Sequence, residues 1–71
     1  MVDTKLLRRK IEERDMNVAD VANLIGLDKA TLYRRLSDAE SFTIGEVSRI
    51  KSALNLSQDE AVSIFFTSAV A

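Results

Sequence analysis

The sequence predicts a compact all-α domain of five helices. Three observations support this prediction. The chain has no proline and only two glycines, 46% of its residues are hydrophobic, and short polar residues repeatedly precede apolar runs with helical spacing. A chain of 71 residues is long enough for one small hydrophobic core. We therefore expect a single domain over residues 1–71.

Each expected helix begins at a residue whose side chain can accept a hydrogen bond from the first turn. In chain order these residues are Asp3 or Thr4, Asn17, Asp28, Thr43 and Ser57. Apolar residues four apart share a helix face, so they should form the buried side. The expected buried residues are Leu7 and Ile11, then Val21 and Ile25, then Leu32 and Leu36, and in the fourth helix Ile44, Val47, Ile50 and Leu54.

The last two helix starts carry an additional feature, the capping box. Thr43 is followed three residues later by Glu46, and Ser57 by Glu60, so hydroxyl and carboxylate can each satisfy a backbone amide of the other residue. We expect the C-terminal helix to cover about 57–69.

Gly26 separates the second and third helices by only two or three residues. Glycine suits an abrupt helix end, because it adopts a positive φ without steric cost. The small side chain of Ala22 allows the next helix to approach closely. A short helix, a glycine turn and a second crossing helix form a helix-turn-helix unit, which we expect over about 17–37.

The composition excludes several classes of function. With no cysteine and no histidine, the chain cannot build a Cys/His zinc site or a Cys–His or Ser–His nucleophile pair. No phosphate-binding loop or metal-ligand cluster is present. We therefore expect no enzyme activity, no cofactor and no small-molecule ligand. The N-terminus lacks a signal-peptide pattern and the apolar stretch at 61–71 is too short to span a bilayer, so we expect a cytoplasmic protein without membrane contact.

The charge distribution is uneven although the net charge is only −1. Residues 1–35 carry a surplus of two positive charges, and residues 36–71 a surplus of three negative charges. In the first helix, Arg8, Lys10 and Arg14 face acidic neighbours, and we expect them to pair within that helix. Any anion-binding surface must therefore come from basic residues gathered locally, such as the adjacent Arg34 and Arg35.

At this point the sequence resembles a known family. The segment "MNVADVANLIGLDKATLYRRL", residues 16–36, is similar to the helix-turn-helix of Cro/cI-type (XRE-like) phage regulators. The flanking segments "KLLRRKIEERDMN" and "SFTIGEVSRIKSALNLSQDEAVSIFF" are similar to the first, fourth and fifth helices of that family. The elements "LYRRL", "FT" and "IFF" resemble a short phage-associated subgroup. The resemblance implies the lambda-repressor-like fold, with the second helix of the unit in the DNA major groove.

The resemblance and a helical wheel together predict the DNA contacts. With Leu32 and Leu36 buried, Arg34 points directly away from the core. The residue types suit guanine, thymine and phosphate groups. The expected base contacts are Lys29, Ala30, Thr31 and Arg34. The expected DNA backbone contacts are Asn17, Tyr33, Arg35, Ser37 and Thr43.

A second surface is predicted in the C-terminal helix. Adjacent residues on a helix point about 100° apart, so one face cannot easily bury both Phe65 and Phe66. If Ala61, Ile64, Phe65 and Ala69 serve the core, an apolar patch of Val62, Phe66 and Val70 remains. We expect this patch to form a homodimer, or a heterodimer with a related repressor, because a lone unit contacts few base pairs.

Two functions fit these observations. The first is a sequence-specific transcriptional regulator, Cro-like or repressor-like, from a phage or mobile element with a lysogeny switch, which acts by occupying a double-stranded DNA operator. The alternative is an antirepressor that pairs with a repressor and blocks its DNA binding. Val18, where the family often has a glutamine, and the pI of about 5.3 favour the alternative.

Overall fold

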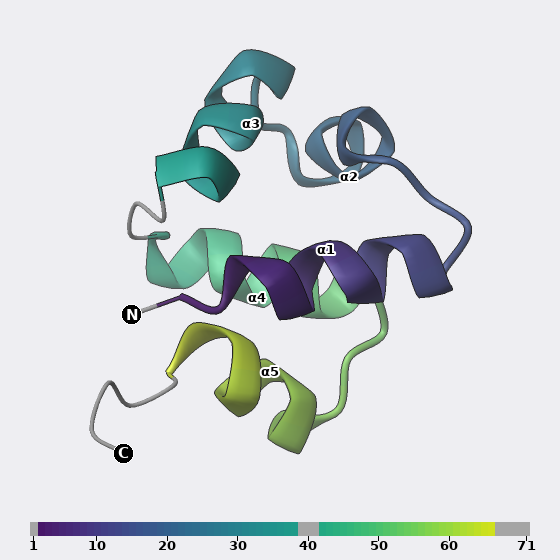
Figure 1. Ribbon diagram of the computed structural model, residues 1–71, viewed down its shortest axis with the longest axis vertical. Helices are drawn as coiled ribbons and strands as arrows, with labels where there is room; N and C mark the ends of the chain where they lie inside the picture. The colour runs from purple at the N-terminus through teal and green to yellow at the C-terminus, as the bar shows by residue number, and fades with distance from the viewer. Residues whose placement is uncertain (1, 39–41, 67–71) are drawn as a thin grey trace.

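Five α-helices make up most of residues 2–38 and 42–66, which are the residues described by the computed structural model (Figure 1). In chain order they are α1 Thr4–Glu13, α2 Val18–Ile25, α3 Lys29–Asp38, α4 Ile44–Ala53 and α5 Gln58–Phe65. These two ranges contain no strand. The predicted all-α fold of five helices is confirmed. The last helix was expected to continue to about residue 69; it ends at Phe65 with Phe66 as its C-cap, and residues 67–69 lie outside the described residues.

The expected residues cap the helix N-termini. Asp3, Asn17, Thr43 and Ser57 each accept a hydrogen bond from the backbone amide three residues later, and Asp28 accepts from Ala30 and Thr31. Both predicted capping boxes are present. A third capping box joins Asn17 to Asp20. It was not predicted, because the usual pattern is Ser or Thr followed by Glu or Gln, whereas here an Asn amide pairs with the shorter carboxylate of Asp.

Helices α1, α2 and α4 end in the same way. Each is followed by a residue in the left-handed region: Asp15 at φ 56°, Gly26 at φ 71° and Asn55 at φ 51°. The next amide then donates to the carbonyl five residues back, as Leu27 does to Ala22 at 2.9 Å. This is the Schellman arrangement. The residue after each turn is apolar and packs on the core: Met16, Leu27 and Leu56.

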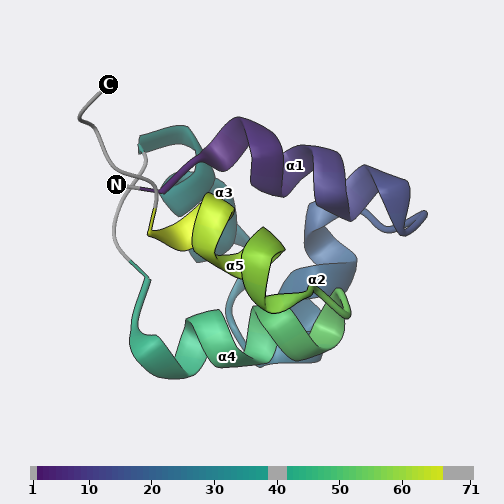
Figure 2. The same cartoon turned by 90° about the horizontal axis from the view of Figure 1, so that it is seen from below.

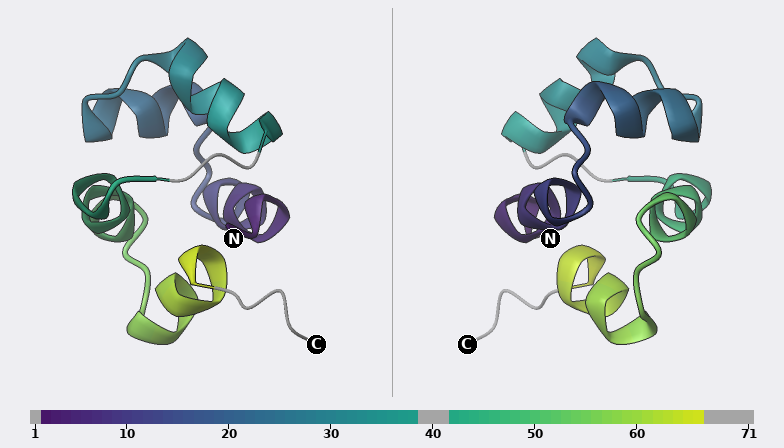
Figure 3. Two further views of the ribbon diagram at one scale, coloured as in Figure 1. Left: turned by 90° about the vertical axis from the view of Figure 1, so that its left-hand side faces the viewer. Right: turned by 90° about the vertical axis from the view of Figure 1, so that its right-hand side faces the viewer.

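The helices surround the core in three levels. Helices α1 and α4 lie on opposite sides, α2 and α3 lie above them, and α5 closes the space below (Figure 3). Seen from below, α5 fills the gap between α1 and α4 (Figure 2). The N-terminal segment joins α5 through the amide of Asp3, which donates to the carbonyl of Ile64 at 2.7 Å. Ile50, Leu54 and Ile64 are completely buried at the centre.

The prediction that Ile44 is buried in the core is wrong. Its side chain is 88% exposed, because Ile44 is six residues before Ile50 and therefore about 120° around the helix from it. Positions four apart share the inward face, and these are Glu46, Ile50 and Leu54. Glu46 is only 8% exposed, so a carboxylate occupies the place on α4 where the apolar pattern predicted an aliphatic side chain.

Lys10 of α1 and Arg14 at its C-cap pair with Glu13 of the same helix, as predicted, with Arg14 Nη1 3.5 Å from Glu13 Oε1. They also contact α5 and the end of α4. Lys10 Nζ lies 2.8 Å from Glu60 Oε2 and 3.4 Å from Glu13 Oε1. Arg14 donates to the carbonyl of Leu54 at 2.9 Å and lies 4.0 Å from Glu60. Hydrogen bonds from Lys10 and from the Ser57 amide lower the pKa of Glu60 to about 2, and the bond to Glu60 raises the pKa of Lys10.

None of the helices in residues 2–38 and 42–66 is long and apolar enough to cross a membrane.

Candidate nucleic-acid interface

The turn between α2 and α3 fixes the two helices across one another. Gly26 ends α2 in the left-handed region, and a Cβ added there would meet no atom within 4 Å. Glycine is therefore required for its backbone conformation and not for space. Val21 and Ile25 of α2 and Leu32 and Leu36 of α3 are buried against each other and the core. As predicted, this packing leaves the opposite face of α3 at the surface (Figure 1).

Three of the four predicted base-contacting residues, Ala30, Thr31 and Arg34, lie on the side of α3 away from Leu32 and Leu36, and Lys29 lies in the first turn. Lys29, Ala30 and Arg34 are exposed, and Thr31 is half-buried. Lys29 and Ala30 are in the first turn, so their side chains stand at the N-terminal end of the helix, beside the α2–α3 turn. Arg34 lies one turn further along. Ala30, Thr31 and Arg34 thus form one strip, with Lys29 at its N-terminal end. The contact of these four residues with bases stays a prediction.

The residues predicted to contact the DNA backbone fall into two groups around this strip. Tyr33 and Ser37 are exposed on α3 itself. Asn17 and Thr43 are exposed at the N-termini of α2 and α4, where their side chains already cap the helices. Backbone amides at such positions favour anions. The fifth residue, Arg35, is partly buried and forms an ion pair with Glu46 of α4.

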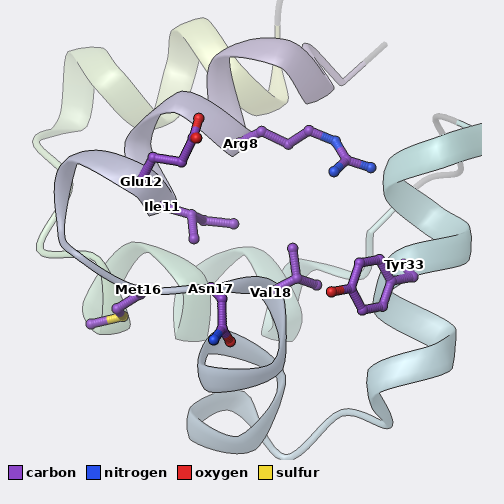
Figure 4. A pocket seen from close by; sticks show the side chains of 7 residues that line it. All are labelled: Arg8, Ile11, Glu12, Met16, Asn17, Val18 and Tyr33. Carbon is purple, nitrogen blue, oxygen red and sulfur yellow. The ribbon is translucent and has the colours of Figure 1, made fainter.

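A hollow of about 460 Å³ separates α3 from α1 and the start of α2 (Figure 4). Its lining consists of Arg8, Ile11, Glu12, Met16, Asn17, Val18 and Tyr33. Arg8 extends from α1 toward α3, and the Tyr33 hydroxyl points toward Val18 (Figure 4). Val18 is buried, so it packs between α1 and α3 instead of presenting its side chain outward. Arg8 was not predicted to be part of this surface, because the hollow forms only where α1, α2 and α3 pack together.

Opposing influences determine the charge state of Glu46. Burial raises its pKa, but the Thr43 amide and the Arg35 guanidinium, both hydrogen-bonded to its carboxylate, together lower the pKa below its ordinary value. Glu46 is therefore a paired, buried anion.

The crossing of α2 and α3 at Gly26 within five helices defines a protein of the helix-turn-helix class. A family model described as "Cro/C1-type HTH DNA-binding domain" matches residues 6–65. The chain belongs to this family, and the match includes nearly all of α1 and the whole of α2 to α5. No curated protein and no solved structure matched the chain. The family is one of DNA-binding regulators rather than of enzymes.

The second predicted surface lies on α5. As expected, Ala61, Ile64 and Phe65 are buried, whereas Val62 is 43% and Phe66 66% exposed. Ala69 and Val70 lie outside the described residues. Phe66 immediately follows α5, and its amide donates to the carbonyl of Val62 at 3.0 Å. An interface at Val62 and Phe66 stays a prediction.

Proposed function

We propose that this protein is a sequence-specific transcriptional regulator that binds an operator through α3 and excludes polymerase by occupying it. The resemblance to short phage-associated regulators supports an origin in a phage or mobile element. The observation that carries the proposal is the exposure of Lys29, Ala30 and Arg34, with half-buried Thr31 beside them, on the second helix of a helix-turn-helix. These side chains suit base edges in the major groove.

The electrostatics of the molecule favour recognition by few, well-placed contacts. With a net charge of −1, the protein has little general attraction for phosphate, and non-specific affinity depends on the number of phosphates neutralised. Specific base contacts must then supply much of the discrimination. A modest salt dependence is the expected consequence.

The test is a selection from a randomised duplex pool, followed by titration of the enriched duplex and a shuffled duplex at two salt concentrations. The proposal expects one sequence to be enriched and bound at least about a thousandfold more tightly than the shuffled duplex. A pool that stays random after repeated rounds, with equal binding to both duplexes, would overturn it.

We also propose that the functional species is a dimer formed through Val62 and Phe66 of the α5 surface. Two large exposed apolar side chains one turn apart support this proposal, as does the need to contact two half-sites for adequate specificity. Sedimentation at tens of micromolar tests it. Phe66→Ser should shift a dimer to monomer, whereas Leu24→Ser, at an equally exposed apolar position on α2, should not. A wild-type monomer under these conditions contradicts the proposal.

The alternative function is an antirepressor that binds a related repressor. One observation favours it: a shallow groove of about 350 Å³ between α2 and α4 is lined by Leu24, Ser48, Arg49, Ser52 and Ala53. Exposed Leu24 and Ile44 add apolar surface to these two helices. If the selection fails and a related repressor loses its own operator when mixed with this protein, the antirepressor function replaces the first proposal.

A further inference from the structure

The side chain of Arg35 connects the C-terminal half of α3 to α4. Helix α3 packs chiefly against α2, and its buried residues Leu32 and Leu36 both lie on that inner face. Arg35 leaves this face sideways and reaches α4, where its Nη1 forms an ion pair with Glu46 Oε1. This ion pair joins the helix that carries the predicted base contacts to the N-terminal turn of α4.

Glu46 is itself held in place, so it provides a fixed anchor. Its Oε1 accepts a hydrogen bond from the Thr43 amide at 2.9 Å, and its own amide donates to the Thr43 hydroxyl at 3.1 Å. The carboxylate is buried on the inward face of α4, where an unpaired charge would be costly. The carboxylate and the Arg35 guanidinium therefore constrain one another, and Arg35 has little freedom to leave.

An aromatic contact holds Arg35 from a second direction. The guanidinium carbon lies 5.6 Å from the centre of the Phe42 ring, within the range of a cation–π interaction. Phe42 in turn meets Phe65 of α5 edge-on, with ring centres 5.6 Å apart. Arg35 is thus fixed both to the start of α4 and, through Phe42, to α5.

We infer that Arg35 is a positioning residue, which sets the angle of α3 on DNA through Glu46 and Phe42. This inference rests on the proposed function, since it requires α3 to enter the DNA. It differs from the phosphate contact predicted from the sequence. An arginine that binds a DNA phosphate must point outward, whereas the Arg35 side chain points toward α4 and is held by the Glu46 carboxylate and the Phe42 ring.

The two roles predict opposite effects of Glu46→Gln. Glutamine retains the acceptor of the capping box and removes only the charge, so the domain should stay folded. If Arg35 is a phosphate ligand, Glu46→Gln releases it and removes a negative charge, and all duplexes bind more tightly. If Arg35 positions α3, the duplex selected by the wild-type protein binds about tenfold more weakly, comparable to the loss of a base contact, while the shuffled duplex is bound no less tightly.

The experiment compares Glu46→Gln, Arg35→Gln and the double variant on the selected and shuffled duplexes at two salt concentrations. Asp59→Asn, at an exposed position on α5, controls for the change of charge. For a positioning residue, the two single variants lose similar specificity, and the double variant loses no more than either alone. The salt slope on the shuffled duplex is the same for Arg35→Gln and wild type, whereas loss of a phosphate contact lowers it by about 0.9.

Arg35→Lys provides a second test if either neutral variant unfolds. Lysine can replace arginine on a phosphate but not in a planar, stacked pairing. The inference expects Arg35→Lys to lose specificity and keep non-specific affinity. Specific binding that is unchanged in Arg35→Lys, or strengthened in Glu46→Gln, overturns the inference. A pool from which the wild-type protein selects no duplex overturns the proposed function instead.

Discussion

Helices α1, α4 and α5 are packed differently from α3. The first three meet around Ile50, Leu54 and Ile64, which are completely buried, and Glu60 joins α1 to α5 through Lys10 and Arg14. Helix α3 instead packs chiefly on α2, beside which it lies (Figure 1), and it is connected to α4 by the Arg35–Glu46 ion pair. Leu32 and Leu36 of α3 still belong to the common core, so the difference concerns the exposed side of α3, where the proposed DNA contacts lie. Substitutions should therefore separate stability from DNA binding.

The largest effect is expected from a cavity at the centre of the first group. Leu54→Ala should lower the free energy of unfolding by about 3 kcal/mol, because Leu54 has no exposed surface and the surrounding helices cannot fully close the void. Urea denaturation followed by circular dichroism measures this loss. Ile44→Ala on the same helix is the matched control and should change stability by no more than about 0.5 kcal/mol. Equal losses at the two positions would contradict the placement of Ile44 at the surface.

A smaller effect is expected at the turn that sets α3 against α2. Gly26→Ala should cost about 1 kcal/mol, because alanine is disfavoured at positive φ. Gly45→Ala is the matched control. That glycine lies in the first turn of α4, and an added Cβ would make an ordinary 3.9 Å contact with Thr43, so it should be neutral or stabilise by up to about 1 kcal/mol. Thermal unfolding of both variants checks the difference, and a loss at Gly45 as large as that at Gly26 would contradict it.

The smallest effect concerns the ion pairs between α1 and α5. The pKa of Glu60 falls from 4.5 to about 2 in the folded protein, so its contribution is complete above the ordinary pKa and is lost as the pH falls from about 4.5 toward 2. Lys10→Met removes the largest cause of this shift and should make stability less dependent on pH in that window. Lys5→Met, exposed on the same helix, should follow the wild type. Melting temperatures between pH 2 and 7 test this, and three parallel curves would rule out the linkage.

Local chemistry made much of the fold predictable from the sequence. The N-cap residues, the Gly26 turn and the inward pairs of α1, α2 and α3 all follow from residue type and spacing, and they were confirmed. Ile44 failed because the pattern was taken as one apolar stripe, although its angle on the helix places it away from Ile50. Glu46 could not be predicted to be inward, because apolar periodicity does not reveal a buried carboxylate whose partner lies on another helix.

The ion pairs were unpredictable for a related reason. Arg35 and Glu46 are 11 residues apart, and Lys10 and Glu60 are 50 residues apart in the chain. Only the packing of the helices decides that these groups meet. The exposed side of α3 was easier to predict, since the spacing of Leu32 and Leu36 identifies the buried side. Its contact with DNA stays a prediction. Arg8 was missed because the hollow that it lines exists only after α1, α2 and α3 have assembled.

The most direct test of the central claim, that α3 carries the recognition surface, is the binding of Arg34→Ala to the duplex selected by the wild-type protein. The matched control is Arg9→Ala, which changes an exposed arginine on α1 instead of α3. The account predicts that Arg34→Ala loses about 1–3 kcal/mol on the selected duplex and relaxes the preference at one or two base pairs, while Arg9→Ala keeps the wild-type preference. Equal losses in the two variants, or an unchanged base preference in Arg34→Ala, would contradict it.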